Sequence, residues 1–181
     1  MRDNIADEEM IPTWVDGRLT PMGKMAVHRA GLKHKAVSVF VTDGHRVLIQ
    51  RRALRKYHTP GLWANTCCTH PRWNEDSADC AVRRLREELG ITGLFPAFAD
   101  RVEYRAAVGN GLTEHEVVDI FVADVTPAMT LAPNPDEVLE VAWVDLYDLS
   151  ADTARNPEKY TPWLRIYMAE HMGRIFGAAV R

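Results

Sequence analysis

At residues 65–71 the chain reads Asn65-Thr66-Cys67-Cys68-Thr69-His70-Pro71, and at residues 74–90 it reads Asn74-Glu75-Asp76-Ser77-Ala78-Asp79-Cys80-Ala81-Val82-Arg83-Arg84-Leu85-Arg86-Glu87-Glu88-Leu89-Gly90. The first segment reads as extended chain, and in the second the apolar residues recur at helical intervals. Asn74 or Asp76 can cap the start of this helix, and Gly90 can close it. We therefore predict an amphipathic helix that follows an extended segment bearing a thiol and an imidazole.

Apolar runs elsewhere in the chain predict strands at residues 36–41, 47–50, 102–108, 114–125 and 138–144. Asp43-Gly44 is a strong signal for a hairpin between the first two strands. Thr161-Pro162 predicts the cap and first turn of a last helix that runs to about residue 176. This order predicts an α/β or α+β fold, in which a mixed sheet is flanked by helices.

The length of 181 residues suits one domain, which we expect to span residues 1–181. The hydrophobic fraction of 46% and the charged fraction of 26% are those of an ordinary globular protein. Residues 1 to about 10 are polar and are expected to form a loose N-terminal arm. Residues 12–24 carry turn residues around short apolar pieces and predict an irregular arm or a small hairpin.

Composition excludes several classes of function. The net charge of −3 and pI of about 6.2 give no overall basic field that would attract nucleic acid. The longest apolar runs are far too short to span a bilayer, and the acidic N-terminus does not resemble a secretory signal. Three cysteines, two of them adjacent, do not make a disulfide framework. A reducing cytoplasm is therefore the expected setting.

Two pairs of reactive residues have strand-like spacing. Residues two apart in an extended chain share a face, so Cys68 and His70 are expected to point together. The same rule places Glu114 and Glu116 on one face, with His115 opposite. One histidine-bearing pair and one doubly acidic pair are well suited to converge on a metal ion.

His28 and His34 could complete such a site. They lie six residues apart, which matches neither a helix face nor a strand face, but a bend at Gly31 would let them meet. Imidazole nitrogens and carboxylate oxygens suit a divalent first-row ion such as Zn²⁺ or Mn²⁺, here with five or six ligands. The alternative is that the two glutamates form a solvated strand face and that each histidine is an isolated surface residue.

Cys68 has two interpretations. Most free cysteines are small buried hydrophobic residues, and we assign Cys67 and Cys80 to that class. A metal-bound imidazole and cationic side chains near Cys68 would instead tune its proton affinity and make it an acid or a base. A zinc finger is not expected, because the adjacent cysteines lack finger spacing.

Basic side chains stand out in a chain that is net acidic, namely Arg51, Arg52, Arg55, Lys56, Arg83, Arg84 and Arg86. They could form a solvated surface of weak ion pairs, each worth about 0.3–0.5 kcal/mol. They could also bind a polyanion, since arginine forks suit phosphate oxygens. Glu88, four residues after Arg84 on one helical face, could then hold Mg²⁺ against a diphosphate.

Residues 69–91 resemble the Nudix box, a glycine followed at fixed intervals by glutamate and by an Arg-Glu and Glu-Glu core. The matching residues are Glu75, Arg83, Leu85, Glu87, Glu88, Gly90 and Ile91. Thr69 stands where the box has glycine, and Arg84 stands where it has glutamate. Replacement of that carboxylate by a cation argues against Nudix-type hydrolysis of a pyrophosphate.

The chain resembles one Nudix-fold family more closely, the type I isopentenyl-diphosphate:dimethylallyl-diphosphate isomerases. The likeness covers roughly residues 14–176 and is carried by His28, His34, Arg51-Arg52-Ala53-Leu54, Pro60-Gly61-Leu62-Trp63, residues 65–71, residues 83–90, Tyr104-Arg105-Ala106, Glu114-His115-Glu116 and Thr161-Pro162-Trp163. The resemblance implies a Nudix-like fold and a small prenyl diphosphate as substrate.

The resemblance also implies a role for each site residue. The ligands of one tightly bound divalent metal (Mn²⁺, Zn²⁺ or Mg²⁺) would be His28, His34, His70, Glu114 and Glu116. Cys68 and Glu116, with Tyr104 beside the carboxylate, would move the protons. The diphosphate would be bound by Mg²⁺ on Glu88 and by Lys24, Arg52, Lys56 and Arg84. Trp163 would cover the hydrocarbon, although a core aromatic is the alternative for this residue.

The expected reaction adds a proton to one alkene carbon and removes another proton on the far side, through a state with tertiary carbocation character. Two alternatives stay open. One is a Nudix hydrolase that acts on a nucleoside diphosphate derivative. The other is a non-catalytic relative that binds a metal or a prenyl diphosphate.

Overall fold

The computed structural model describes residues 9–125 and 129–177, so most of the N-terminal arm expected at residues 1–10 lies outside the described residues. A nine-stranded mixed sheet forms the middle of the molecule. Its strands are β1 (Met10–Val15), β2 (Arg18–Gly23), β3 (His34–Asp43), β4 (Arg46–Arg52), β5 (Trp63–Ala64), β6 (Cys67–Thr69), β7 (Ala97–Gly109), β8 (Leu112–Asp124) and β9 (Val138–Asp145). The expected mixed sheet with flanking helices is confirmed.

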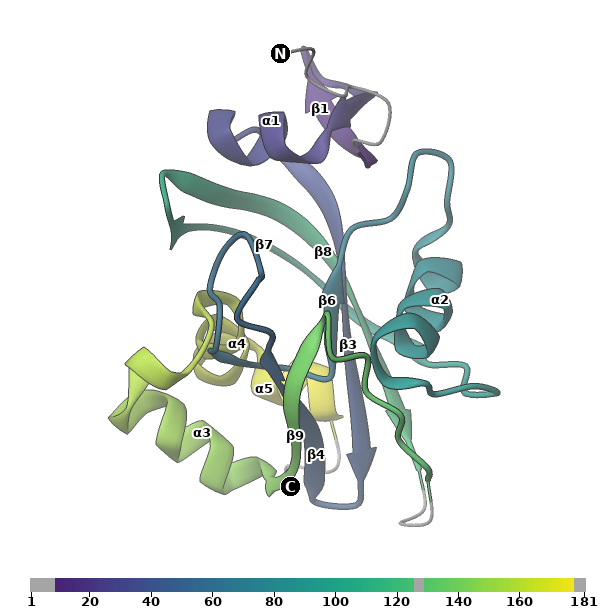
Figure 1. The fold of residues 1–181 in the computed structure, drawn as a ribbon, viewed down its shortest axis with the longest axis vertical. Helices are drawn as coiled ribbons and strands as arrows, with labels where there is room; N and C mark the ends of the chain where they lie inside the picture. Colours follow the sequence, from purple (N-terminus) through teal and green to yellow (C-terminus); the bar gives the residue numbers. More distant parts are fainter. Residues whose placement is uncertain (1–8, 126–128, 178–181) are drawn as a thin grey trace.

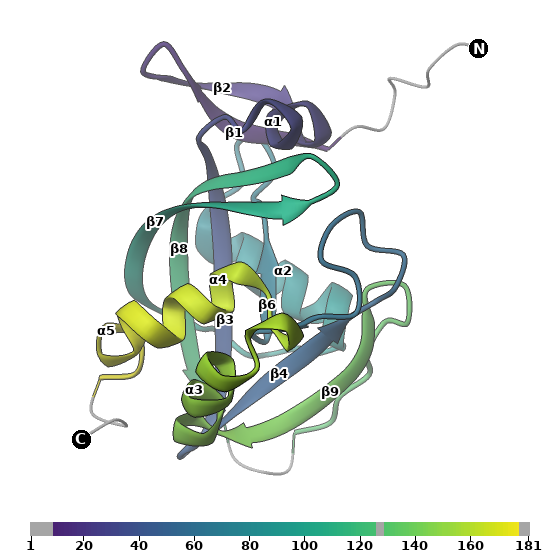
Figure 2. The same cartoon turned by 90° about the vertical axis from the view of Figure 1, so that its left-hand side faces the viewer.

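Helices cover both faces of this sheet (Figures 1 and 2). The helix α2 (Ser77–Leu89) lies on one face, and α3 (Leu146–Arg155), α4 (Pro162–Ile166) and α5 (Met172–Phe176) lie on the other. The short helix α1 (Lys24–Ala30) packs with the β1–β2 hairpin at one end of the molecule. The hairpin confirms one of the two expectations for residues 12–24.

β3 explains why the sheet has a hydrophobic core on each of its two faces. Its residues are buried almost without interruption, and successive side chains point to opposite faces. Val37, Val39 and Val41 pack toward α2, whereas Ala36 and Phe40 pack with the C-terminal helices. Each face of the strand thus contributes to a separate hydrophobic core.

The helix after residue 74 has the ends that its sequence predicts. The side chain of Asp76 accepts a hydrogen bond from the backbone N–H of Ala78, and Gly90 ends the helix in the left-handed conformation at φ +68°. Leu85 and Leu89 are fully buried against the sheet. Cys67 and Cys80 are also fully buried in this core, as expected for structural cysteines.

Two helices were not expected from the sequence. α1 begins at Gly23 without a side-chain cap, so no local signal marks its start. α3 begins at Asp145, whose side chain accepts hydrogen bonds from the backbone N–H groups of Tyr147 and Asp148. The expected last helix begins after Thr161, which makes no side-chain cap bond, and it is interrupted by a π-helical segment, Tyr167–His171.

In the part of the chain that the structure describes, no helix is long and apolar enough to cross a bilayer.

Candidate active site

The strand registers bring the reactive side chains together. β3 and β8 run parallel and pair His34 with Glu116. β6 pairs antiparallel with β3 and sets Cys68 opposite Ser38. β7 pairs antiparallel with β8 and sets Tyr104 opposite Glu116. Central strands of one sheet therefore fix the positions of the thiol, the phenol and the carboxylate.

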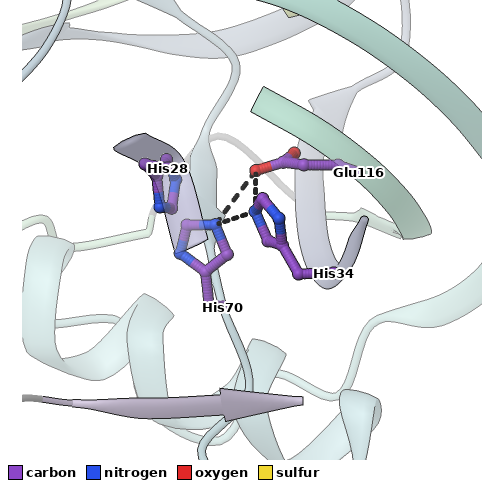
Figure 3. A group of neighbouring side chains, drawn as sticks. All are labelled: His28, His34, His70 and Glu116. Atoms are coloured by element: carbon purple, nitrogen blue, oxygen red, sulfur yellow. Dashed lines mark hydrogen bonds and ion pairs between the residues drawn. The ribbon is translucent and has the colours of Figure 1, made fainter. Parts of the chain in front are cut away.

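Three imidazoles and one carboxylate converge at the end of the sheet next to α1 (Figure 3). The Nε2 atom of His70 lies 3.2 Å from Nε2 of His34 and 3.0 Å from Oε1 of Glu116. His34 Nε2 lies 3.4 Å from the same carboxylate oxygen. The ring of His28 lies beside these groups, tilted against the ring of His34 with the two centroids 4.8 Å apart. All four side chains are buried.

The bend expected at Gly31 brings His28 to His34. Gly31 ends α1 at φ +62°, a left-handed conformation that favours glycine, and the chain then turns into β3. The Nδ1–H of His28 donates to the carbonyl of Lys24 at 2.7 Å, and that of His34 donates to the carbonyl of Leu32 at 2.8 Å. Each bond leaves the Nε2 lone pair free to face the cluster.

This donor set fits a divalent metal ion. A first-row ion at about 2.0–2.2 Å from its ligands keeps neighbouring ligand atoms about 3.0–3.5 Å apart. The ligand atoms of His34, His70 and Glu116 lie 3.0–3.4 Å from one another. The Nε2 atom of His28 is buried and has no hydrogen-bond partner in the described parts of the chain, and a metal would supply one. Burial lowers the pKa of His28 to about 4, with His34 adding to the effect, and burial also lowers the pKa of His70 well below its usual range. These two imidazoles are thus held in the neutral form that binds metals.

Glu114 and Glu116 share one face, as their spacing predicts, and Tyr104 bridges them. The phenolic O–H of Tyr104 lies 2.8 Å from Glu114 Oε2 and 2.7 Å from Glu116 Oε2. Burial raises the pKa of Glu114, and the neighbouring Glu116 raises it further. Burial also opposes ionisation of Glu116, but the imidazoles of His34 and His70 outweigh it and lower its pKa. One carboxyl group is thus favoured as the acid and the other as the anion.

Glu114 belongs to a second buried group. Its Oε1 atom lies 3.2 Å from Nε2 of His58. The possible ligand atoms of His28, His58 and Glu114 all lie within 4.8 Å of one another, close enough to share a metal ion. His58 was not among the residues expected in the site. It lies in the loop after β4, where the only signal was its closeness to Arg51 and Arg52 along the chain. Glu114 therefore contacts His58 and Tyr104 directly, and of the other expected ligands it is grouped with His28.

Cys68 lies on the opposite side of its strand from the buried Cys67. The hydroxyl of Ser38 is 3.6 Å from its sulfur, and that hydroxyl also lies 3.1 Å from the phenolic oxygen of Tyr167. Burial raises the pKa of the Cys68 thiol, and the charges of Glu116 and Glu114 raise it further. The thiol is therefore held protonated next to two carboxyl groups.

A narrow pocket opens beside the cluster. It is lined by Lys24, Arg52, Lys56, Tyr57, His58, Cys68, Thr69, His70, Arg84, Glu114 and Trp163. All the cations that the resemblance assigns to diphosphate binding thus line one pocket, together with the thiol and the indole. Trp163 is fully buried and donates from Nε1 to Asn65 at 3.1 Å, so it is both a core aromatic and a wall of the pocket.

The pocket cations have carboxylate or aromatic partners. Arg84 contacts Glu88 at 2.6 Å and Glu137 at 3.4 Å, and Lys56 also pairs with Glu137. The guanidinium carbon of Arg52 lies 5.3 Å from the centre of the Trp163 ring. Lys24 pairs with Glu9 at 3.1 Å. The cations therefore line the pocket, and neighbouring carboxylates partly neutralise the charges of Arg84, Lys56 and Lys24.

Glu88 lies away from the histidine cluster. It is 3% exposed, and it contacts Gln50 at 2.7 Å in addition to Arg84. Elsewhere in the box-like segment, Glu75 receives two bonds from Arg83, at 2.5 and 2.7 Å. The helix therefore presents Glu88 toward the pocket cations, while the Glu75–Arg83 pair fastens the preceding loop.

Comparison with known proteins agrees with this geometry. A NUDIX domain profile matches residues 32–164. A protein named isopentenyl-diphosphate Delta-isomerase from Dinoroseobacter shibae is 68% identical over 170 residues, which cover 94% of this chain and 97% of the relative. A relative of the same name from Cereibacter sphaeroides is 69% identical over 169 residues, covering 93% of this chain and 96% of the relative.

Solved structures share the fold at low identity. DR0079 from Deinococcus radiodurans superposes with a TM-score of 0.68 at 16% identity, covering 88% of this chain and 97% of that one. A MutT NUDIX hydrolase from Burkholderia pseudomallei superposes with a TM-score of 0.58 at 22% identity, covering 75% of this chain and 95% of that one.

The fold and the box-like helix thus define a Nudix-type protein. The chain belongs to the Nudix-domain family and, within it, to the isopentenyl-diphosphate Delta-isomerases.

Proposed function

We propose that this enzyme interconverts isopentenyl diphosphate and dimethylallyl diphosphate. One observation carries the proposal. A single pocket combines phosphate-binding cations and an indole with a protonated thiol, and it adjoins a buried carboxylate–imidazole cluster. The close relatives that bear the isomerase name support it.

The proton movements are assigned to Cys68 and to the Glu116–Tyr104 pair. A proton adds to the terminal methylene carbon of the alkene, and another leaves the methylene carbon on the other side of the branched carbon. The pKa of Cys68 is raised, whereas that of Glu116 is lowered, and such a split between neighbouring groups suits an acid and a base. The two groups exchange roles when the reaction reverses.

The branched carbon carries positive charge between the two proton transfers. The face of Trp163 is suited to stabilise that charge by cation–π attraction, worth about 2 kcal/mol when desolvated. The carboxylate of Glu116 adds electrostatic stabilisation. The buried walls of the pocket keep water from capturing the cation.

We assign most of the contacts that bind the substrate to its diphosphate group. Lys24, Arg52, Lys56 and Arg84, which line the pocket, would contact its oxygens, and Glu88, which contacts Arg84, would hold the Mg²⁺ that accompanies it. This contact supplies binding energy remote from the reacting carbons. The histidine cluster, with Glu114 and Glu116, would hold one divalent ion (Mn²⁺, Zn²⁺ or Mg²⁺) that orients the carboxylates and favours their ionised form.

The setting we propose is the cytoplasm, since Cys67, Cys68 and Cys80 are all free thiols in the structure. The proposed partner is a small prenyl diphosphate rather than nucleic acid or a membrane, in keeping with the net charge of −3.

An assay with isopentenyl diphosphate and Mg²⁺ tests the assignment. We expect the protein to form dimethylallyl diphosphate, and we expect Cys68→Ala and Glu116→Gln each to lower kcat by at least about 10²–10⁴-fold, the usual contribution of a general acid or base. Circular dichroism should show that both variants keep the fold. Full activity in both variants would refute the site, and release of phosphate would indicate the alternative Nudix hydrolase.

A further inference from the structure

His58 is a buried residue of the pocket without a role in the reaction proposed above. It is 2% exposed, although it lies in a loop rather than in a strand or helix. Its Nε2 atom lies 3.2 Å from Glu114 Oε1, a close contact that lacks hydrogen-bond geometry, and it has no hydrogen-bond partner among the described residues. A polar atom this deeply buried is costly unless it serves a partner. Among the described residues, the acceptor in contact with this nitrogen is the carboxylate of Glu114.

The other ring nitrogen of His58 faces two donors. Nδ1 lies 3.4 Å from Nη2 of Arg52 and 3.0 Å from the hydroxyl of Thr59. The same Arg52 nitrogen also donates to the carbonyl of His58 at 3.2 Å. A guanidinium can only donate, so the Nδ1 lone pair must face Arg52. The ring proton of neutral His58 is therefore on Nε2, the atom that faces Glu114.

Packing holds the ring in this orientation. Its centroid is 5.8 Å from that of Trp163 in an edge-on arrangement and 5.8 Å from that of His28 in a stacked one. The ring of Tyr57 packs against it at 4.2 Å. Since aromatic groups surround the ring, it cannot swing away without disturbing the pocket.

We propose that His58 is a positioning residue, whose Nε2–H holds Glu114 at the metal centre and links it to Arg52 at the diphosphate end of the pocket. This inference rests on the proposed function for the roles of the metal centre and of Arg52. The contacts then run without a break from Arg52 through His58 to Glu114, and on through Tyr104 to Glu116.

The proposal predicts how the metal is bound. A carboxylate ligand held by two donors is oriented before the ion arrives, and loss of such an outer partner typically costs about 10–100-fold in metal affinity or activity. Tyr104 holds one oxygen of Glu114, so His58 supplies the second contact.

Mn²⁺ binding to the metal-stripped full-length protein tests this proposal without relying on catalysis. Free Mn²⁺ is followed by electron paramagnetic resonance in wild type, His58→Ala and His58→Gln. We expect alanine to weaken Mn²⁺ binding about 10–100-fold. We expect glutamine, whose amide N–H can reach the same carboxylate, to restore most of it. His115→Ala is the matched control, because His115 points to the other face of β8 and contacts Glu103 at 3.4 Å.

Two results would overturn the proposal. Unchanged Mn²⁺ affinity in His58→Ala would show that Glu114 needs no second donor. Equal weakening in the alanine and glutamine variants would show that ring packing, rather than the N–H group, matters. Wild-type turnover of isopentenyl diphosphate is scored separately. Failure of the isomerase assignment would therefore appear as absent turnover in wild type, whichever way the Mn²⁺ affinities fall.

Discussion

Two of the basic side chains that line the pocket form ion pairs with a neighbouring carboxylate. Glu137 contacts both Lys56 and Arg84, two of the cations assigned to the diphosphate. The Lys56 and Arg84 charges lower the pKa of Glu137 despite its partial burial, so it is an anion at neutral pH. A diphosphate must therefore compete with this carboxylate for the same two cations.

Replacement of Glu137 by glutamine removes this competition. We expect Glu137→Gln to bind inorganic pyrophosphate in Mg²⁺ more tightly, by about 2–5-fold, because a partly exposed ion pair is worth up to about 1 kcal/mol. Isothermal titration calorimetry measures the change. Glu140→Gln is the control, since Glu140 pairs with Arg51 at the exposed edge of β9. Weaker binding in Glu137→Gln would mean that Glu137 holds the cations in place instead.

Residues in regular strands could be placed from the sequence, whereas residues in loops could not. The two-residue spacing correctly predicted that Cys68 and His70 share a face, as do Glu114 and Glu116. His58 and Glu137 lie in irregular segments, where spacing says nothing about direction. Their contacts with residues far apart in the chain arise only from tertiary packing.

Among the helices and strands, α2 shows how a single glycine at the C-terminal end of a helix can be required by its surroundings. The backbone N–H of Gly90 bonds to carbonyls of the last turn, and the segment around Ala132, which precedes β9, packs closely across it. A Cβ on Gly90 would lie 2.7 Å from Cβ of Ala132, in a left-handed conformation that other residues rarely adopt.

Alanine at this position should therefore destabilise the protein through both strain and contact. We expect Gly90→Ala to lower the free energy of unfolding by about 2–4 kcal/mol, measured by urea denaturation. Gly93→Ala is the matched control, because Gly93 has φ +73° and nothing within 4 Å of its Cβ position. We expect Gly93→Ala to lower the free energy of unfolding by only about 1 kcal/mol, through backbone strain alone. Equal losses would show that the contact with Ala132 is relieved at no cost.

Elements with strong local signals were predicted, and those that depend on context were not. The α2 helix has a cap, an apolar stripe and a closing glycine, and the β3–β4 hairpin has its Asp43-Gly44 turn. α1 is short and uncapped, so its formation depends on packing against β8 and the first hairpin. α1 carries His28. Because this helix was not predicted, the sequence analysis could explain the contact between His28 and His34 only by a bend at Gly31.

At the scale of the whole molecule, the metal-binding cluster joins the end of the sheet to α1. His28, His34, His70 and Glu116 come from four separate parts of the chain and are all buried (Figure 3). Without a metal, burial lowers the pKa values of His28 and His70, so these two imidazoles are neutral in the folded protein at pH values where the unfolded chain binds protons. Protonation therefore favours the unfolded state.

The sign of this effect can be measured on the metal-stripped protein. Burial lowers the pKa of His28 to about 4 from the usual 6.5, so its contribution is present above pH 6.5 and is lost toward pH 4. We expect wild type to lose about 2 kcal/mol more stability than His28→Gln between pH 7.5 and pH 5, by urea denaturation in EDTA. Parallel losses in the two proteins would mean that His28 is as easily protonated in the folded state as in the unfolded chain.

The central claim is that two groups on opposite sides of the alkene, Cys68 and Glu116, add one proton and remove another while the diphosphate stays intact. Turnover of isopentenyl diphosphate in D₂O, followed by NMR and mass spectrometry, tests it most directly. We predict dimethylallyl diphosphate that carries deuterium in the newly formed methyl group, with no phosphate released. Product without deuterium would contradict the claim, and so would phosphate release without a moved double bond.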